Sequence, residues 1–182
     1  MSQLADLAED VGVAERTLRR AAGQGTLRAE CLSPRKLRLL PGEAAYVRRN
    51  WQLLAALRWA LRTEPNVVFA MVFGSAARGD DRPDSDVDLM VVLREQSLEK
   101  MVELQDRLQV ATGKDIDLVG KEDASKNEVL MALAVEEGRA LVDRVGLWPE
   151  LQGEREELGR RGDRSLRRDR RRALTAIDAF LS

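Results

Sequence analysis

VVFAMVFGSAARGDDRPDSDVDLMVVL, residues 67–93, contains the clearest strand and turn signals of the chain. Its first eight residues form a continuous apolar run rich in Val and Phe, as expected of a strand buried on both faces. Residues 86–93 predict a second strand, and Gly74 and Ser75 start the turn that follows the first. Since residues i and i+2 of a strand point to the same face, Asp86 and Asp88 project together, about 6 to 7 Å apart along the backbone. The stretch therefore predicts two strands that present a carboxylate pair beside a small turn.

These residue types suit the binding of a metal-bound phosphate. Magnesium prefers oxygen ligands and usually keeps waters and substrate phosphates in its shell, which an open carboxylate pair permits. Gly74 has no Cβ and lets the backbone approach a phosphate, while the Ser75 hydroxyl can donate to its oxygens. Asp117 is a candidate third carboxylate, because Ile116 and Leu118 would face the other side of their strand. Asp115 and Asp123 compete with it for this role.

The arrangement of Gly74-Ser75, ten further residues and Asp86-Val87-Asp88 resembles the minimal nucleotidyltransferases of the DNA polymerase beta-like superfamily. The resemblance covers roughly residues 50–145, and Asp117 matches the third acidic position of that family. It implies an α/β (α+β) fold, in which a small mixed sheet is flanked by helices. It also implies transfer of a nucleoside monophosphate, AMP above all, from a nucleoside triphosphate bound with Mg²⁺ or Mn²⁺ to an acceptor hydroxyl.

We expect three kinds of role at this site. Asp86, Asp88 and Asp117 are the expected catalytic residues and metal ligands. The expected nucleotide-binding residues are Gly74, Ser75, Arg78 and Ser85, with Arg82 as a further phosphate neighbour. Guanidinium groups bind phosphate oxygens in pairs, although Arg78 could instead form an ion pair with Asp80 or Asp84.

The resemblance also implies a class of acceptor. Many small bacterial members resemble antitoxins that adenylylate a partner toxin of the HEPN ribonuclease type, and others are toxins that act on tRNA. Relatives that modify antibiotics usually have a further substrate domain, for which 182 residues leave little room. We therefore expect ATP as donor and a macromolecule as acceptor, in a toxin–antitoxin pair. The alternative is a DNA-binding regulator whose nucleotidyltransferase domain is inactive and only senses nucleotide.

The N-terminal segment predicts a second module. An amphipathic helix fits Leu4 to Val11, and a second fits residues 14–22 and presents Arg16, Arg19 and Arg20 outward. Residues 26–32 and 36–40 read as short strands around Ser33, Pro34 and Arg35. The segment thus resembles a winged helix-turn-helix module, whose recognition helix could contact DNA phosphates and bases. DNA binding would favour a homodimer, since two half-sites multiply the modest affinity of one small module.

The chain divides accordingly into a helix-turn-helix-like domain (1–42), a connecting helix (43–65), a nucleotidyltransferase domain (66–148) and a charged C-terminal helix or tail (149–182). In the third unit we expect a helix over 95–113, a strand over 115–120 and a closing helix over 129–142. The tail contains eight Arg between Arg160 and Arg172. Such a charge run is typical of a solvated helix or a disordered tail. Its final apolar stripe should dock on this domain or on a partner; that stripe is Ala173, Leu174, Ile177, Phe180 and Leu181.

Composition narrows the chemistry further. The chain has no His and a single cysteine, Cys31, so a zinc cluster, an internal disulfide and any His-dependent nucleophilic mechanism are excluded. The net charge of −1 hides an acidic middle and basic flanks, a distribution that suits a cation-binding centre with polyanion-facing ends. The sequence contains neither a leader-like start nor a long apolar run. We therefore expect a cytoplasmic protein that does not enter a membrane.

Overall fold

The N-terminal part of the chain contains two short helices and a hairpin. The computed structural model describes residues 3–33 and 36–181. Helix α1 (Gln3–Asp10) and helix α2 (Glu15–Gly23) are followed by strands β1 (Ala29–Ser33) and β2 (Lys36–Leu39), which pair antiparallel. The helices and strands therefore occur where the sequence predicts them, whereas the predicted turn at Pro34 and Arg35 lies outside the described residues.

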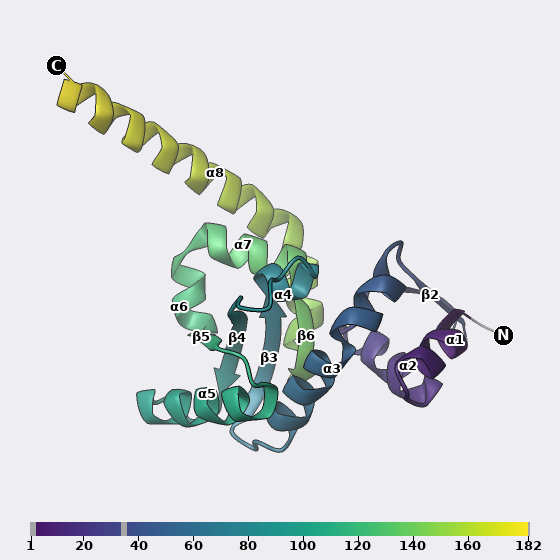
Figure 1. Cartoon of the computed structure of the whole chain (residues 1–182). Helices are drawn as coiled ribbons and strands as arrows, with labels where there is room; N and C mark the ends of the chain where they lie inside the picture. Colours follow the sequence, from purple (N-terminus) through teal and green to yellow (C-terminus); the bar gives the residue numbers. More distant parts are fainter. Residues whose placement is uncertain (1–2, 34–35, 182) are drawn as a thin grey trace.

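Helix α3 (Glu43–Arg62) leads from this N-terminal part to the sheet, as Figure 1 shows. It begins after Gly42, whose positive φ of 81° suits a residue without a side chain. The apolar residues of α1, α2 and α3 belong to the same buried cluster as residues of the sheet, among them Leu18, Leu57 and Leu89. One continuous core therefore joins the N-terminal part to the rest of the molecule.

A mixed four-stranded sheet forms the centre of the molecule. Its strands are β3 (Val67–Phe73), β4 (Val87–Leu93), β5 (Ile116–Gly120) and β6 (Arg139–Asp143), in the order β5-β4-β3-β6. Strand β3 is antiparallel to both neighbours, and β4 is parallel to β5. All residues of β3 are buried, because both faces of the sheet are covered. A mixed α/β fold with helices flanking a small sheet is thus confirmed.

Helices cover the two faces of the sheet differently. Helix α5 (Leu98–Thr112) packs with α3 on one face. Helix α6 (Lys121–Lys126) and helix α7 (Glu128–Glu137) contribute to a second buried cluster with Phe69, Met71 and Met90 on the other face. The short helix α4 (Gly74–Arg78) directly follows β3. It stands where the sequence predicts only a turn.

The predicted helix over 129–142 is wrong beyond residue 137. Helix α7 ends at Glu137, Gly138 is extended (φ −67°, ψ 166°), and the following residues form edge strand β6. A Cβ on Gly138 would lie 2.1 Å from the Met71 Cε atom and 2.2 Å from the Ala134 carbonyl oxygen. The glycine thus allows the chain to leave the helix and pass close to β3, and an apolar run as short as ALV does not distinguish a strand from a helix.

The C-terminal segment is one long helix, α8 (Leu147–Leu181), which packs on α7 and then extends away from the body of the molecule (Figure 1). Of the apolar stripe predicted to dock, Ala173 and Leu174 are exposed, so they do not dock on this chain. The side chains of Ile177, Phe180 and Leu181 lie outside those described. None of the helices in the described part of the chain has the length and apolar character needed to cross a membrane.

Candidate active site

The structure brings three carboxylates to one end of the sheet. Asp88 on β4 is paired in register with Asp117 on the parallel strand β5, and Asp86 lies two residues before Asp88. Paired residues of neighbouring strands, and residues i and i+2 of one strand, share a face of the sheet. Asp88 is half-buried, while Asp86 and Asp117 are exposed. The carboxylates therefore line one accessible edge, with Asp88 deepest.

The alternatives to Asp117 lie elsewhere. The Asp115 carbonyl oxygen accepts a hydrogen bond from the Val87 amide at 2.9 Å, so this residue precedes the paired part of β5. Asp123 belongs to α6 and its carboxylate contacts the Lys126 ammonium at 2.6 Å. Of the three candidates, only Asp117 lies opposite Asp88 in the register.

The electrostatics of this edge favour a cation. Partial burial raises the pKa of the Asp88 carboxyl, and the negative charges of Asp117 and Asp86 raise it further, while Arg78 acts in the opposite direction. Burial and these two negative charges thus make ionisation of Asp88 less favourable. A positive charge placed among them would relieve this repulsion.

The turn after β3 lies directly against Asp88. Gly74 has a φ of 67°, and a Cβ at this position would lie 2.3 Å from the Asp88 Oδ2 atom. Any other residue would therefore be strained in the backbone and would displace the carboxylate. The Ser75 carbonyl oxygen accepts a hydrogen bond from the Gly79 amide at 2.8 Å, which closes the short helix α4. Gly74 and Ser75 thus border the carboxylate edge as the sequence predicts.

Arg78 is held by two acidic residues. Its Nη1 atom lies 2.6 Å from the Glu137 Oε2 atom, and its Nε atom lies 3.1 Å from the Asp80 Oδ2 atom. Hydrogen bonds, first with Glu137 and then with Asp80, raise the pKa of the Arg78 guanidinium. Asp80 is one of the two partners that the sequence suggests, whereas Glu137 comes from α7 and no local pattern indicates it. A phosphate would have to compete with these carboxylates for the guanidinium.

The loop between α4 and β4 is fixed by Ser85 and by a lysine that the sequence does not single out. The Ser85 Oγ atom accepts a hydrogen bond from the Arg82 amide at 2.9 Å. The Lys114 ammonium lies 3.4 Å from the Asp81 Oδ2 atom and 3.5 Å from the Pro83 carbonyl oxygen. Both contacts shape the loop that leads to Asp86. Ser85 therefore has a structural partner in addition to its expected role at the nucleotide.

A buried arginine supports the turn from behind. The Arg139 Nε atom donates to the Ala77 carbonyl oxygen at 2.7 Å, and its two terminal nitrogens contact the Glu43 carboxylate at 2.6 and 3.1 Å. The side chains of Arg139 and Glu43 are only 2% and 3% exposed. This pair joins β6 and α3 to the turn that begins at Gly74. No local pattern indicates the pair, because the sequence predicts a helix at residue 139.

Tyr46 completes this support. Its hydroxyl donates to the Ala76 carbonyl oxygen at 2.9 Å, and its ring lies 3.5 Å from the Arg139 guanidinium carbon. Burial is the main cause that raises the Tyr46 pKa to about 12, so the phenol stays a hydrogen-bond donor across the neutral range. Two side chains from outside the motif therefore hold the backbone of α4 in place.

The fit of a divalent metal depends on these carboxylates. All three side chains offer oxygen ligands, which magnesium prefers. A cation between them would offset the repulsion of their negative charges. Among residues 3–33 and 36–181, however, no group of three acidic side chains is already arranged to hold a metal. The donor types fit Mg²⁺, and metal binding would draw the carboxylates closer together.

A buried strand, a glycine turn and an in-register pair of aspartates on the next two strands define a nucleotidyltransferase-type site, and comparisons with known proteins agree. The family model described as polymerase beta, nucleotidyltransferase matches residues 56–145. Protein adenylyltransferase MntA of Thermococcus cleftensis is 41% identical over 70 residues, which are 38% of this chain and 71% of that relative. The chain belongs to the polymerase beta nucleotidyltransferase family, and it is a nucleotidyltransferase.

Two solved structures are also similar to parts of the chain. A crystal structure of a toxin–antitoxin with AMP-PNP matches 71% of this chain and 98% of its own, with 23% identity and a TM-score of 0.48. A structure of a tri-AMPylated Shewanella oneidensis HEPN toxin in complex with MNT antitoxin matches 73% of this chain and 99% of its own matched chain, with 21% identity and a TM-score of 0.45. At these values the likenesses support no inference about function.

Proposed function

We propose that this chain transfers AMP from ATP to a hydroxyl group of a macromolecule. The single observation that carries the proposal is the Asp88 carboxylate, which lies against the Gly74 turn, pairs in register with Asp117 and follows Asp86 by two residues. The relative from Thermococcus cleftensis carries the name protein adenylyltransferase, which supports ATP as donor and a protein as acceptor.

The residues of the site have different roles in this reaction. The amides and hydroxyl at Gly74 and Ser75 would hold phosphate oxygens, while Arg78 and Ser85 border the same loop. The oxygen of the acceptor hydroxyl attacks the α-phosphorus, the bond between that phosphorus and the oxygen bridging to the β-phosphate breaks, and pyrophosphate leaves. Asp117 is positioned to take the proton of the attacking hydroxyl. The product is an AMP phosphodiester of the acceptor.

Asp86, Asp88 and Asp117 are the residues that would hold Mg²⁺ or Mn²⁺. When bound, such a metal supplies positive charge to the phosphate oxygens. Burial and the negative charges of Asp117 and Asp86 raise the pKa of Asp88, and a cation beside it would favour the ionised carboxylate.

We propose a partner toxin of the HEPN ribonuclease type as the acceptor, so that this chain is the antitoxin of a toxin–antitoxin pair. The proposal rests on the resemblance to small bacterial family members and on the name of the MntA relative. Transfer to tRNA is the competing possibility within the same reaction class, and a panel of acceptors distinguishes the two.

The test is an incubation of the chain with each of the four nucleoside triphosphates, labelled at the α-phosphate, and with protein and RNA fractions of the host. We expect label from ATP to enter one protein band in wild type. Asp88→Asn should abolish transfer, and Asp123→Asn, which changes an acidic residue outside the site, should leave it intact. Label in RNA alone would replace the protein acceptor with tRNA. No transfer to any fraction would overturn the proposal.

The N-terminal helices and hairpin support a second candidate, a helix-turn-helix-like module that binds DNA. The sequence prediction placed Arg16, Arg19 and Arg20 on the recognition helix. In the structure Arg19 contacts Glu15 at 2.5 Å, while Arg16 and Arg20 line a cleft toward α3. A regulator that binds DNA and only senses nucleotide would shift its own upstream DNA in a gel and show no transfer in the experiment above.

A further inference from the structure

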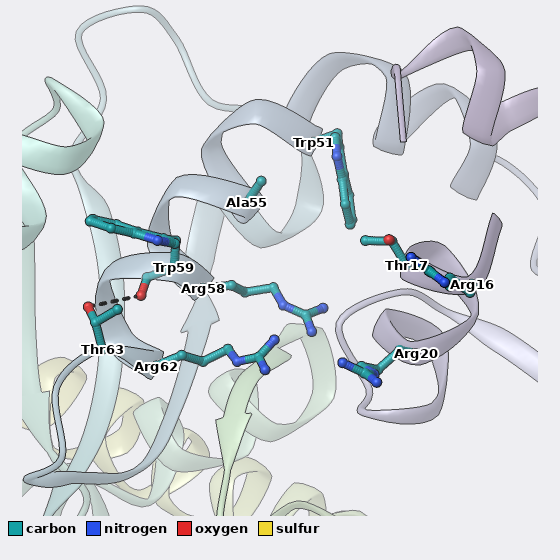
Figure 2. A pocket seen from close by; sticks show the side chains of 9 residues that line it. All are labelled: Arg16, Thr17, Arg20, Trp51, Ala55, Arg58, Trp59, Arg62 and Thr63. Atoms are coloured by element: carbon teal, nitrogen blue, oxygen red, sulfur yellow. Dashed lines mark hydrogen bonds between the residues drawn. The ribbon is translucent and has the colours of Figure 1, made fainter. Parts of the chain in front are cut away.

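A cleft of about 610 Å³ lies between α2 and the C-terminal half of α3, outside the catalytic edge. Figure 2 shows Arg16, Thr17 and Arg20 on one wall, facing Trp51, Arg58 and Arg62 of α3, while the indole of Trp59 extends away from them at the rim. Volumes of about 300 to 1,000 Å³ are typical of ligand pockets. The α3 residues that line this cleft begin with Trp51, and Trp59 lies 13 residues after the Tyr46 that contacts the Gly74 turn, about 20 Å along the helix at 1.5 Å per residue.

The cleft concentrates positive charge. Figure 2 shows Arg20 from α2 and Arg58 and Arg62 from α3 pointing toward one another across the opening. Elsewhere arginines pair with acidic residues, for example Arg48 with Asp10. Within the part of the chain that the structure describes, none of the three cleft arginines forms an ion pair with a carboxylate.

Arg58 makes this charge unusual, because it is buried. Its side chain belongs to a residue that is only 7% exposed, and its nitrogens donate to the Thr26 Oγ1 atom at 2.8 Å and to the Gln24 Oε1 atom at 2.5 Å. Burial, together with the charges of Arg62 and Arg20, lowers the Arg58 pKa to about 10. A buried cation usually needs an opposite charge. The two hydrogen-bond partners of Arg58 are neutral, so its charge remains available to an anion in the cleft.

An aromatic surface borders the same charges. Trp51 is buried and forms a wall of the cleft, whereas Trp59 is 69% exposed and stands between Arg58 and Arg62 in the sequence. A single exposed apolar side chain is common and needs no explanation. The exposed indole at the rim and the three converging guanidinium groups inside the cleft supply the two elements that bind a nucleotide unit, a stacking surface and a phosphate site.

We propose that this cleft binds a nucleotide unit, with its phosphate between Arg20, Arg58 and Arg62 and its base stacked on Trp59. The unit belongs either to a single-stranded nucleic acid or to a free nucleotide, which share this chemistry. The site is separate from the carboxylate edge, so the inference does not depend on the proposed AMP transfer. The proposal assigns nucleotide binding to residues of α3, whereas the sequence prediction of a recognition helix includes only residues of α2.

The test measures fluorescence anisotropy of a labelled single-stranded RNA dodecamer with the full chain in EDTA, with unlabelled AMP, inorganic phosphate and polyglutamate as competitors. We expect Trp59→Ala and Arg62→Ala to weaken binding at least fivefold, which is about 1 kcal/mol, the lower bound for a base stacked on an aromatic side chain. Both residues are exposed at the surface. Arg49→Ala removes one exposed charge from the same helix outside the cleft and should change affinity less than twofold.

The salt dependence and the competitors decide between ligands. Arg62→Ala should also flatten the dependence of affinity on salt, since each phosphate neutralised on a single strand contributes a log-log slope of about −0.7. Tight binding of the dodecamer with weak competition by AMP identifies a strand, and equal binding of AMP identifies a free nucleotide. Equal losses in Arg49→Ala, competition by polyglutamate alone, or no binding of either nucleotide form at low salt would each overturn the proposal.

Discussion

Removing Glu43 should destabilise the protein far more than removing an exposed carboxylate. Glu43 and Arg139 form a bidentate pair with N–O distances of 2.6 and 3.1 Å, and both are at most 3% exposed. Glu43→Ala leaves the Arg139 guanidinium buried without an opposite charge, a change that costs about 3 to 5 kcal/mol. For a chain of this size each kcal/mol lowers the Tm by about 2 to 4 °C. The expected drop is therefore about 6 to 20 °C.

The control is an exposed ion pair, which joins Asp10 of α1 to Arg48 of α3. Arg48 and Asp10 are 50% and 45% exposed, and an exposed pair contributes about 0 to 1 kcal/mol. Urea unfolding followed by circular dichroism gives both free energies at pH 7. Replacing both members of the buried pair with leucine should recover part of the loss, because no charge is then left buried. If Glu43→Ala costs no more than Asp10→Ala, the buried pair does not support the fold as described.

Three further predictions concern the turn, the site and the last helix. Gly74→Ala should reduce AMP transfer by about 100-fold through displacement of the Asp88 carboxylate, while Gly113→Ala, with the same φ of 67° and nothing within 4 Å, should leave transfer intact. The Asp88 pKa is raised above its ordinary value of 3.8, so the metal-free wild type should lose stability relative to Asp88→Asn as pH rises through that raised pKa. Urea titrations between pH 3 and 8 measure the free energy of unfolding of both proteins, and a difference that does not change with pH would contradict this. Gly153→Ala should stabilise α8 by about 0.5 to 1 kcal/mol. Gly162→Ala should instead lower the Tm, because its Cβ would lie 2.7 Å from a Cβ on α7. Equal effects of the two substitutions on the Tm would show that α8 is not packed closely on α7 at Gly162.

The sequence predicts the elements whose apolar pattern is strong. Residues 43–62 form the expected connecting helix, and the two strands of the 67–93 stretch differ from their predicted bounds by one residue or less. The hydrophobic period and the length of these segments suffice to predict a helix or a strand, because each element buries one continuous surface. The shared face of Asp86 and Asp88 follows from the same reasoning, since strand alternation fixes which side chains of one strand share a face. The position of Asp117 opposite Asp88 depends on the pairing of β4 with β5.

Contacts between distant segments could not be predicted in this way. Strand β6 is short, apolar and continuous with α7, so only the packing of Gly138 against Met71 shows that the helix has ended. The assignment of residue 139 to a helix then hid its pairing with Glu43. Likewise, Glu137 approaches Arg78 across 59 residues of sequence, and the cleft arginines gather only when α2 packs beside α3. These features depend on tertiary packing, which local periodicity does not report.

We infer that the carboxylate edge catalyses transfer of the nucleotidyl group itself. The most direct measurement follows ATP labelled at the α-phosphate and, separately, at the γ-phosphate, with Mg²⁺, the wild-type chain and an HEPN-type ribonuclease as acceptor. We expect α-label to enter the ribonuclease, γ-label to appear only in released pyrophosphate, and Asp88→Asn to abolish both. Transfer of γ-label to the acceptor, or undiminished α-label with Asp88→Asn, would contradict it.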